Sequence, residues 1–178
     1  MRKTLLLFTP MALALLLAAG TAWAALPAPT VVSTVPPNGA TGVVRSADIT
    51  AQFSEAMRTK SLGICNHCTF TSSSKTFYLL KGQFIGSTTA PFKNPPRFCA
   101  PPGTSPSTAP PCPAPIPARV SYNAGTFTAT LDPSSTLLSN TTYTAVVEGT
   151  NDGDFVSVKD ADGTPMASDR IFSFTTAP

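Results

Sequence analysis

Residues 48–57 restrict the possible folds of this chain more than any other segment. Ile49, Ala51 and Phe53 are apolar and alternate with polar residues. A period of two residues is typical of a β-strand that packs one face on a core. The Ser-Glu-Ala-Met sequence that follows breaks the alternation, so we expect the strand to end in a turn. Much of the remaining chain is suited to pack against such a strand.

Other short alternating segments predict the partner strands. They cover residues 31–35, 40–44, 69–71, 76–81, 119–122, 126–131, 142–148 and 170–175. Gly, Pro and Asn separate most of them, and no window supports an amphipathic helix longer than a turn or two. Short strands at near-regular spacing indicate an all-β fold, an antiparallel β-sandwich of about seven strands.

The inward-facing residues of these strands form the predicted core. They are Val32, Ile49, Phe53, Phe127, Leu131, Tyr143, Ala145, Val147, Phe172 and Phe174. In segment 76–81, Phe77 and Leu79 are expected on one face, with Tyr78 and Leu80 on the other. Tyr143 has the sequence position of a tyrosine corner in Ig-like sandwiches, or it is an ordinary half-buried tyrosine.

The first 24 residues have the three-part layout of a secretory signal peptide. Basic residues precede an apolar run at 5–19, and Ala-Trp-Ala at 22–24 offers a cleavage site. The run is short for a membrane span and contains Pro10, so cleavage is favoured over anchoring. We expect a signal peptide at 1–24, a flexible leader at 25–30 and one Ig-like domain at 31–178. The protein would be secreted, periplasmic or at the cell surface, with no membrane span after cleavage.

The charge balance gives no reason to expect a nucleic-acid partner. Arg2 and Lys3 leave with the signal peptide, which lowers the formal net charge of +3 by two. The remaining basic residues are scattered rather than clustered. A chain of about 150 residues buries roughly two-thirds of its unfolded surface, which is enough for one core.

Residues 58–119 interrupt the regular spacing and form the predicted insertion. Its part at 88–117 is rich in proline, which cannot donate to a strand ladder, so a loop is expected there. All four cysteines lie in the insertion: Cys65, Cys68, Cys99 and Cys112. An even count in an exported protein predicts two disulfides. Local pairing is favoured, although the sequence leaves all three pairings open.

The same cysteines allow other chemistry. A zinc site could use all four, or His67 in place of one. Oxidising compartments favour disulfides, so we expect no metal. A c-type haem needs the histidine after the second cysteine, whereas His67 precedes Cys68. A redox-active Cys-x-x-Cys would need a thioredoxin-like setting that the sequence lacks.

An acidic loop at 151–163 contains Asp152, Asp154, Asp160 and Asp162, with Asp169 nearby. Carboxylates at alternate positions can share a calcium ion. The closing Glu and other ligands of an EF-hand loop are missing, so turn formation is the simpler interpretation. Calcium binding between Asp152 and Asp162 is left open.

Catalysis is not expected, because no nucleophile with its base and no paired carboxylates stand out. His67 is the only histidine, and Glu55 and Glu148 are the only glutamates. Glu55 falls in the turn after the first core strand, where a carboxylate more often bonds local backbone. We therefore expect a protein that is not an enzyme and needs no cofactor.

Five segments follow one another in the order of a known family. They are PPNGATGV at 36–43, ITAQFSEAM at 49–57, TLLSNTTYTAVVEG at 136–149, VKDADGTPM at 158–166 and IFSFTT at 171–176. Together they resemble the SbsA-type bacterial Ig-like domain, found in surface-layer and other exported bacterial proteins. The resemblance covers 30–57 and 120–176, while the insertion with its cysteines departs from it.

The resemblance implies an Ig-like sandwich without characteristic catalytic residues. We therefore expect an exported, non-enzymatic module for structural or adhesive interactions, with other cell-surface or envelope proteins, or glycans, as partners. The alternative is a glycan- or ligand-binding module that uses the insertion loop. Phe84, Phe92 and Phe98 in the insertion could contact a partner, but we expect them to pin the insertion to the sandwich.

Overall fold

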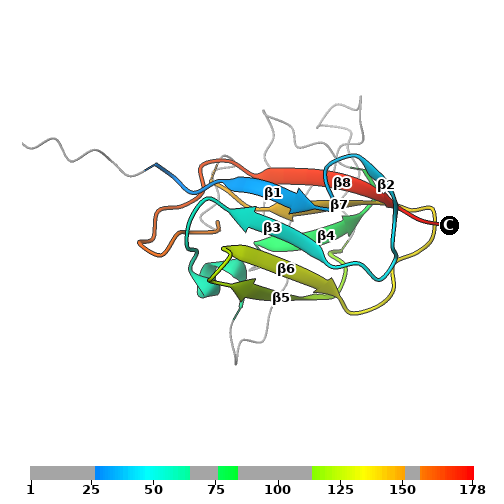
Figure 1. The fold of residues 1–178 in the computed structure, drawn as a ribbon, viewed down its shortest axis with the longest axis horizontal. Helices are drawn as coiled ribbons and strands as arrows, with labels where there is room; N and C mark the ends of the chain where they lie inside the picture. Colours follow the sequence, from blue (N-terminus) through cyan, green and yellow to red (C-terminus); the bar gives the residue numbers. More distant parts are fainter. Residues whose placement is uncertain (1–26, 65–75, 84–113, 151–156) are drawn as a thin grey trace, which may run out of the picture.

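The computed structural model describes residues 27–64, 76–83, 114–150 and 157–178 (Figure 1). These residues form eight strands in two packed sheets, and one short 3-10 helix, η1 (Thr59–Leu62). The strands are β1 (Val31–Val35), β2 (Ala40–Val43), β3 (Ile49–Phe53), β4 (Phe77–Lys81), β5 (Ala118–Asn123), β6 (Thr128–Pro133), β7 (Thr142–Val147) and β8 (Arg170–Thr176). Within the described ranges, no helix has the length and apolar character needed to cross a membrane.

The strands are ordered β1-β3-β6-β5 in the first sheet and β2-β8-β7-β4 in the second. Five of the six pairings are antiparallel, but β2 pairs with β8 in parallel. The expected antiparallel sandwich is therefore confirmed except for this parallel pairing at the edge of the second sheet. The chain crosses from the first sheet to the second at residues 36–39 and keeps its direction, so β2 and β8 run the same way (Figure 1).

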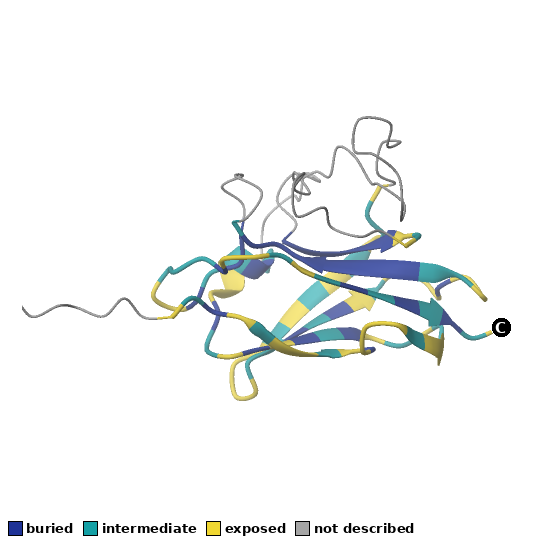
Figure 2. Cartoon of the chain, turned by 90° about the horizontal axis from the view of Figure 1, so that it is seen from above, coloured by how far each residue is buried: buried dark blue, intermediate teal, exposed yellow. Residues whose placement is uncertain are grey.

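The core lies between the two sheets and contains most of the predicted residues. Ile49, Phe53, Leu131, Tyr143, Ala145, Val147, Phe172 and Phe174 are all buried. Figure 2 shows this burial concentrated on the strands. The strand alternation read from residues 48–53 is confirmed, since β3 buries Ile49, Ala51 and Phe53.

Of the two remaining predicted core residues, one is exposed and the other lies at the edge of the core. Val32 is 57% exposed, because the register of β1 shifts between Val31 and Ser33 and Val31 packs against the core instead. Phe127 is half-buried and packs against the main core. It precedes β6 in a turn at 124–127 and has a φ of 51°.

The tyrosine corner is confirmed. The Leu138 backbone N–H donates to Tyr143 Oη at 2.9 Å. The Tyr143 ring stacks on Phe174, with ring centroids 6.0 Å apart. This bond fixes the connection before β7 to the core, as expected for an Ig-like sandwich.

Part of the stretch predicted as an insertion belongs to the sheets. β4 pairs with β7, and the Ile116 N–H donates to the Leu79 carbonyl at 2.8 Å just before β5 begins. The predicted alternation of β4 is confirmed, because Phe77 and Leu79 face the main core and Tyr78 and Leu80 form a separate cluster. Residues 65–75 and 84–113, with all four cysteines and the strand predicted at 69–71, lie outside the described residues.

Candidate functional site

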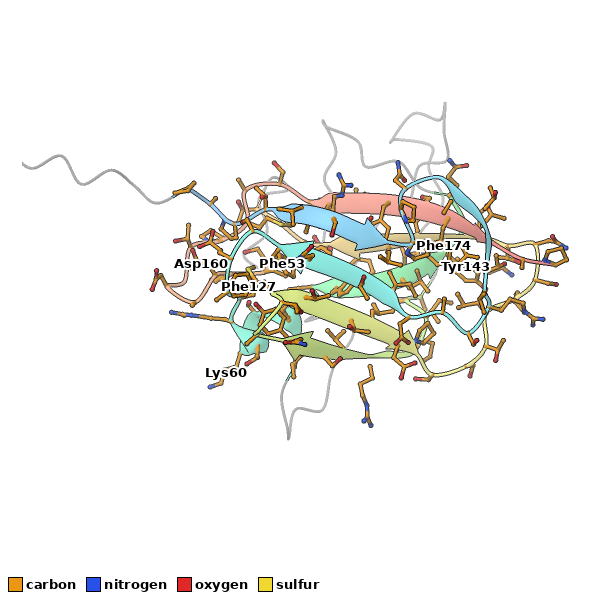
Figure 3. The ribbon with its side chains drawn as sticks, in the orientation of Figure 1. Phe53, Lys60, Phe127, Tyr143, Asp160 and Phe174 are labelled. Carbon is orange, nitrogen blue, oxygen red and sulfur yellow. The ribbon has the colours of Figure 1, made fainter. Side chains whose placement is uncertain are left out.

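Loops at one end of the sandwich form the candidate site, called here the Asp160 end. It comprises residues 54–64, 76, 148–150 and 157–169, which follow β3 and β7 and precede β4 and β8. Loops on a rigid sandwich are where binding residues usually lie. Figure 3 places Asp160 and Lys60 towards this end, with Tyr143 and Phe174 farther along the molecule.

Asp160 is the centre of a tight turn. Its Oδ1 accepts the N–H groups of Gly163 at 2.6 Å and Thr164 at 2.7 Å. Its own N–H donates to the Thr164 carbonyl at 3.0 Å. Burial raises the pKa of this carboxyl, but the hydrogen bonds from Thr164 and Gly163 outweigh burial and leave the pKa below its usual range. Asp160 is thus an ionised residue that holds the turn together, as the sequence predicted for a turn former.

Arg58 packs over the same turn. Its Nε donates to the Ala161 carbonyl at 3.1 Å, and its backbone N–H donates to the Lys159 carbonyl at 2.9 Å. Gly163 has a φ of +102°, and a Cβ there would lie 3.1 Å from the Arg58 guanidinium. The turn therefore favours glycine at 163 for its backbone conformation, and any larger residue would also displace the arginine guanidinium by a few tenths of an ångström.

Ser61 ties η1 to the rest of the Asp160 end. Its Oγ lies 2.7 Å from the Arg58 carbonyl, 3.2 Å from the Lys159 carbonyl and 2.9 Å from the Lys159 nitrogen, which donates to it. The Ser61 carbonyl accepts the hydroxyl of Thr76, the residue before β4. Three segments far apart in the sequence are thus joined by one side chain and its carbonyl.

Glu148 was given no role from the sequence, yet it is fully buried at the end of β7. The Tyr78 hydroxyl donates to its Oε1 at 2.5 Å. Its backbone N–H donates to the Thr76 carbonyl, and its carbonyl accepts the Val158 N–H. A buried carboxylate is costly unless hydrogen-bonded, and here Tyr78 supplies a bond from the neighbouring strand. On the glutamate's side, the sequence signal was a charged residue directly after the apolar pair Val146 and Val147.

The predicted acidic cluster is only partly described. Asp160 uses Oδ1 for the turn, Asp162 is exposed, and Asp169 Oδ1 accepts the Gly149 N–H at 2.7 Å. In the ranges that the structure describes, no three His, Cys, Asp or Glu side chains gather where they could hold a metal ion. Asp152 and Asp154 lie outside those ranges, so calcium binding between Asp152 and Asp162 stays a prediction.

The remaining sequence-selected residues are dispersed or not described. Glu55 is half-buried in the turn after β3, and the described bonds of its neighbour Ser54 are both with Thr30. His67 lies with Cys65 and Cys68 outside the described residues. The arrangement described so far can hold loops rigid, and it brings no sequence-selected nucleophile to a base.

Comparison with known proteins identifies a family model that matches most of the chain. The family model described as "Bacterial Ig-like domain" matches residues 27–92 and 101–176. Among curated proteins, none matches. PcoC, a methionine-rich copper resistance protein from Escherichia coli, is 15% identical with a TM-score of 0.49, over 84% of this chain and 99% of PcoC. A structure of domains 1–6 of the surface layer protein SbsC gives 16% identity and a TM-score of 0.44, over 85% of this chain and 14% of the SbsC chain in that structure.

Proposed function

Since the chain belongs to the bacterial Ig-like domain family, we propose that it is an exported, non-enzymatic module for structural or adhesive contacts at the cell surface. The observation that carries this proposal is the use of polar side chains at the Asp160 end. Ser61, Asp160 and Asp169 each bond backbone groups of the chain itself. Such bonds make a rigid scaffold, whereas a catalytic group must be directed at a substrate.

The domain layout follows from the same proposal. Residues 1–24 are a signal peptide, 25–30 a short leader, and 31–178 the Ig-like domain. The bonds between Thr30 and Ser54 support a domain boundary near this position, because they attach the chain to the sandwich just before β1. The mature protein is then secreted, periplasmic or displayed at the cell surface.

The insertion carries the distinctive surface of this module. We assign two disulfides to Cys65, Cys68, Cys99 and Cys112, because an exported chain with four cysteines is expected to oxidise them. Its partners are other cell-surface or envelope proteins, or glycans.

Binding to the envelope of the producing bacterium tests the proposed role. Purified exported protein is incubated with intact cells and with isolated envelope, and the bound fraction is measured after sedimentation over a range of concentrations. Saturable retention is expected, and protein that stays in the supernatant at every concentration would contradict the proposal. Release of the bound protein by soluble envelope glycan fragments would favour the glycan-binding alternative.

A further inference from the structure

We propose that residues 84–113 cover a second hydrophobic core on the outer face of the β2-β8-β7-β4 sheet. The proposal extends the proposed function by assigning an inner side of the insertion to the sandwich. It does not depend on an adhesive role, since it concerns contacts within the chain.

The outer face of this sheet is buried, although such a face would be expected to contact solvent. Tyr78, Leu80 and Val146 form a cluster separate from the main core, with exposed fractions of 2%, 0% and 0%. Thr144 and Glu148 on the same face of β7 are also fully buried. The outer face of an antiparallel sandwich sheet is ordinarily polar and solvated. Among the described apolar residues, only Ile171 of β8 packs against this cluster.

The chain turns towards this face as it leaves β4. The Gly82 N–H donates to the Thr142 carbonyl at 2.8 Å, which continues the ladder with β7. The Gly82 carbonyl then accepts the hydroxyl of Thr144, which lies on the outer face, at 2.8 Å. Gly82 has a φ of 116°, a conformation that favours glycine. The first residue after β4 is therefore already bonded to the outer face.

The first described residues after position 113 lie beside the same strand, β4. The Ile116 N–H donates to the Leu79 carbonyl in the middle of β4. The described residues on both sides of 84–113 therefore lie beside the edge of the sheet whose outer face is buried. They form the longest of the three internal segments outside the described residues, the others being 65–75 and 151–156.

The composition of residues 84–113 suits such a cover. Phe84, Phe92 and Phe98 supply apolar side chains for an apolar face. The many prolines have no N–H group, so the segment leaves fewer backbone donors to be satisfied over a sheet face. The outer face of the other sheet, with exposed Gln52 and Ser121, is then the sheet face accessible to a partner.

Photo-crosslinking in the full exported chain tests the assignment without changing its sequence. Photo-leucine replaces leucine during expression, and crosslinked peptides are mapped by mass spectrometry. Leu80 is expected to crosslink mainly to residues 84–113, while its neighbour Leu79 crosslinks to strands of the main core. The proposal would be overturned if the crosslinks from Leu80 led mainly to residues 65–75, to residues 151–156 or to a second copy of the chain.

Oxidative footprinting of the tyrosines gives an independent readout. Phe92→Asp and Phe98→Asp are expected to raise modification of Tyr78 several-fold while leaving Tyr143 protected, with Ser105→Asp as the matched control. Protection of Tyr78 equal to wild type in both variants would overturn the proposal. If either variant exposes Tyr143 as well, the sandwich has unfolded and the Leu80 crosslinks decide.

Discussion

Replacing Gly149 with alanine tests how tightly the end of β7 packs against the segment before β8. A Cβ at position 149 would lie 2.3 Å from the Ser168 carbonyl carbon and 2.7 Å from its nitrogen and oxygen. Carbon atoms in contact normally lie about 3.5–4.0 Å apart. The obstacle is backbone, and the Gly149 N–H is held to Asp169 at 2.7 Å. Overpacking costs about 1–3 kcal/mol, and we expect Gly149→Ala near the upper end, about 3 kcal/mol.

Thermal and urea unfolding of three alanine variants provides the assay. For a chain of this size, a loss of about 3 kcal/mol lowers Tm by about 6–12 °C. At Gly42 a Cβ meets nothing within 4 Å, but φ is +66°, so Gly42→Ala should cost about 1 kcal/mol. At Gly125 the nearest atom is the exposed Asn123 Oδ1 at 3.3 Å, so Gly125→Ala should change stability by less than about 0.5 kcal/mol. If the Gly149→Ala variant were as stable as the Gly125→Ala variant, the close approach of position 149 to the Ser168 backbone would be refuted.

Three further predictions concern the core, the corner and the acidic turn. Phe174→Ala should lower the free energy of unfolding in urea by about 3–5 kcal/mol. Val32→Ala, at a position that is 57% exposed, should lower it by less than about 0.5 kcal/mol. Equal losses in the two variants would contradict the assignment of β1 as a peripheral strand. Tyr143→Phe removes the acceptor of the Leu138 N–H and should cost about 1 kcal/mol, and an unchanged urea midpoint would count against the tyrosine corner. Because the pKa of Asp160 lies below the ordinary 3.8 in the fold, its ionised form contributes stability above that value, and the contribution is lost as pH falls through the lowered pKa. The Asp160→Asn variant should therefore be about 1 kcal/mol less stable than wild type near pH 7. In acid its stability should approach that of wild type, and a difference in stability that does not depend on pH would be inconsistent with this assignment.

Local patterns predicted most of the strands, because each core strand alternates in a way that is visible within a few residues. The limits of β1 were predicted correctly, and Phe53 and Phe174 proved buried as expected. Register and sheet partner depend on residues far apart in the sequence. The shift after Val31 and the parallel pairing of β2 therefore had no local signal.

The candidate site was less predictable for the same reason. The turn-forming role of Asp160 was visible in the Asp-Ala-Asp-Gly sequence, since its partners lie within four residues. The bond between Tyr78 and Glu148 joins positions 70 residues apart, which no local pattern could pair. Segment 76–81 did contain a signal, because apolar residues on both of its faces predict burial on both sides.

Intact-mass spectrometry of the protein recovered outside the cytoplasm, with and without reduction, tests the central claim most directly. The account of an exported, disulfide-containing Ig-like module predicts the mass of residues 25–178 less four hydrogens, with the hydrogens regained on reduction. A protein that retains residues 1–24, or whose four cysteines are all free thiols, would contradict it.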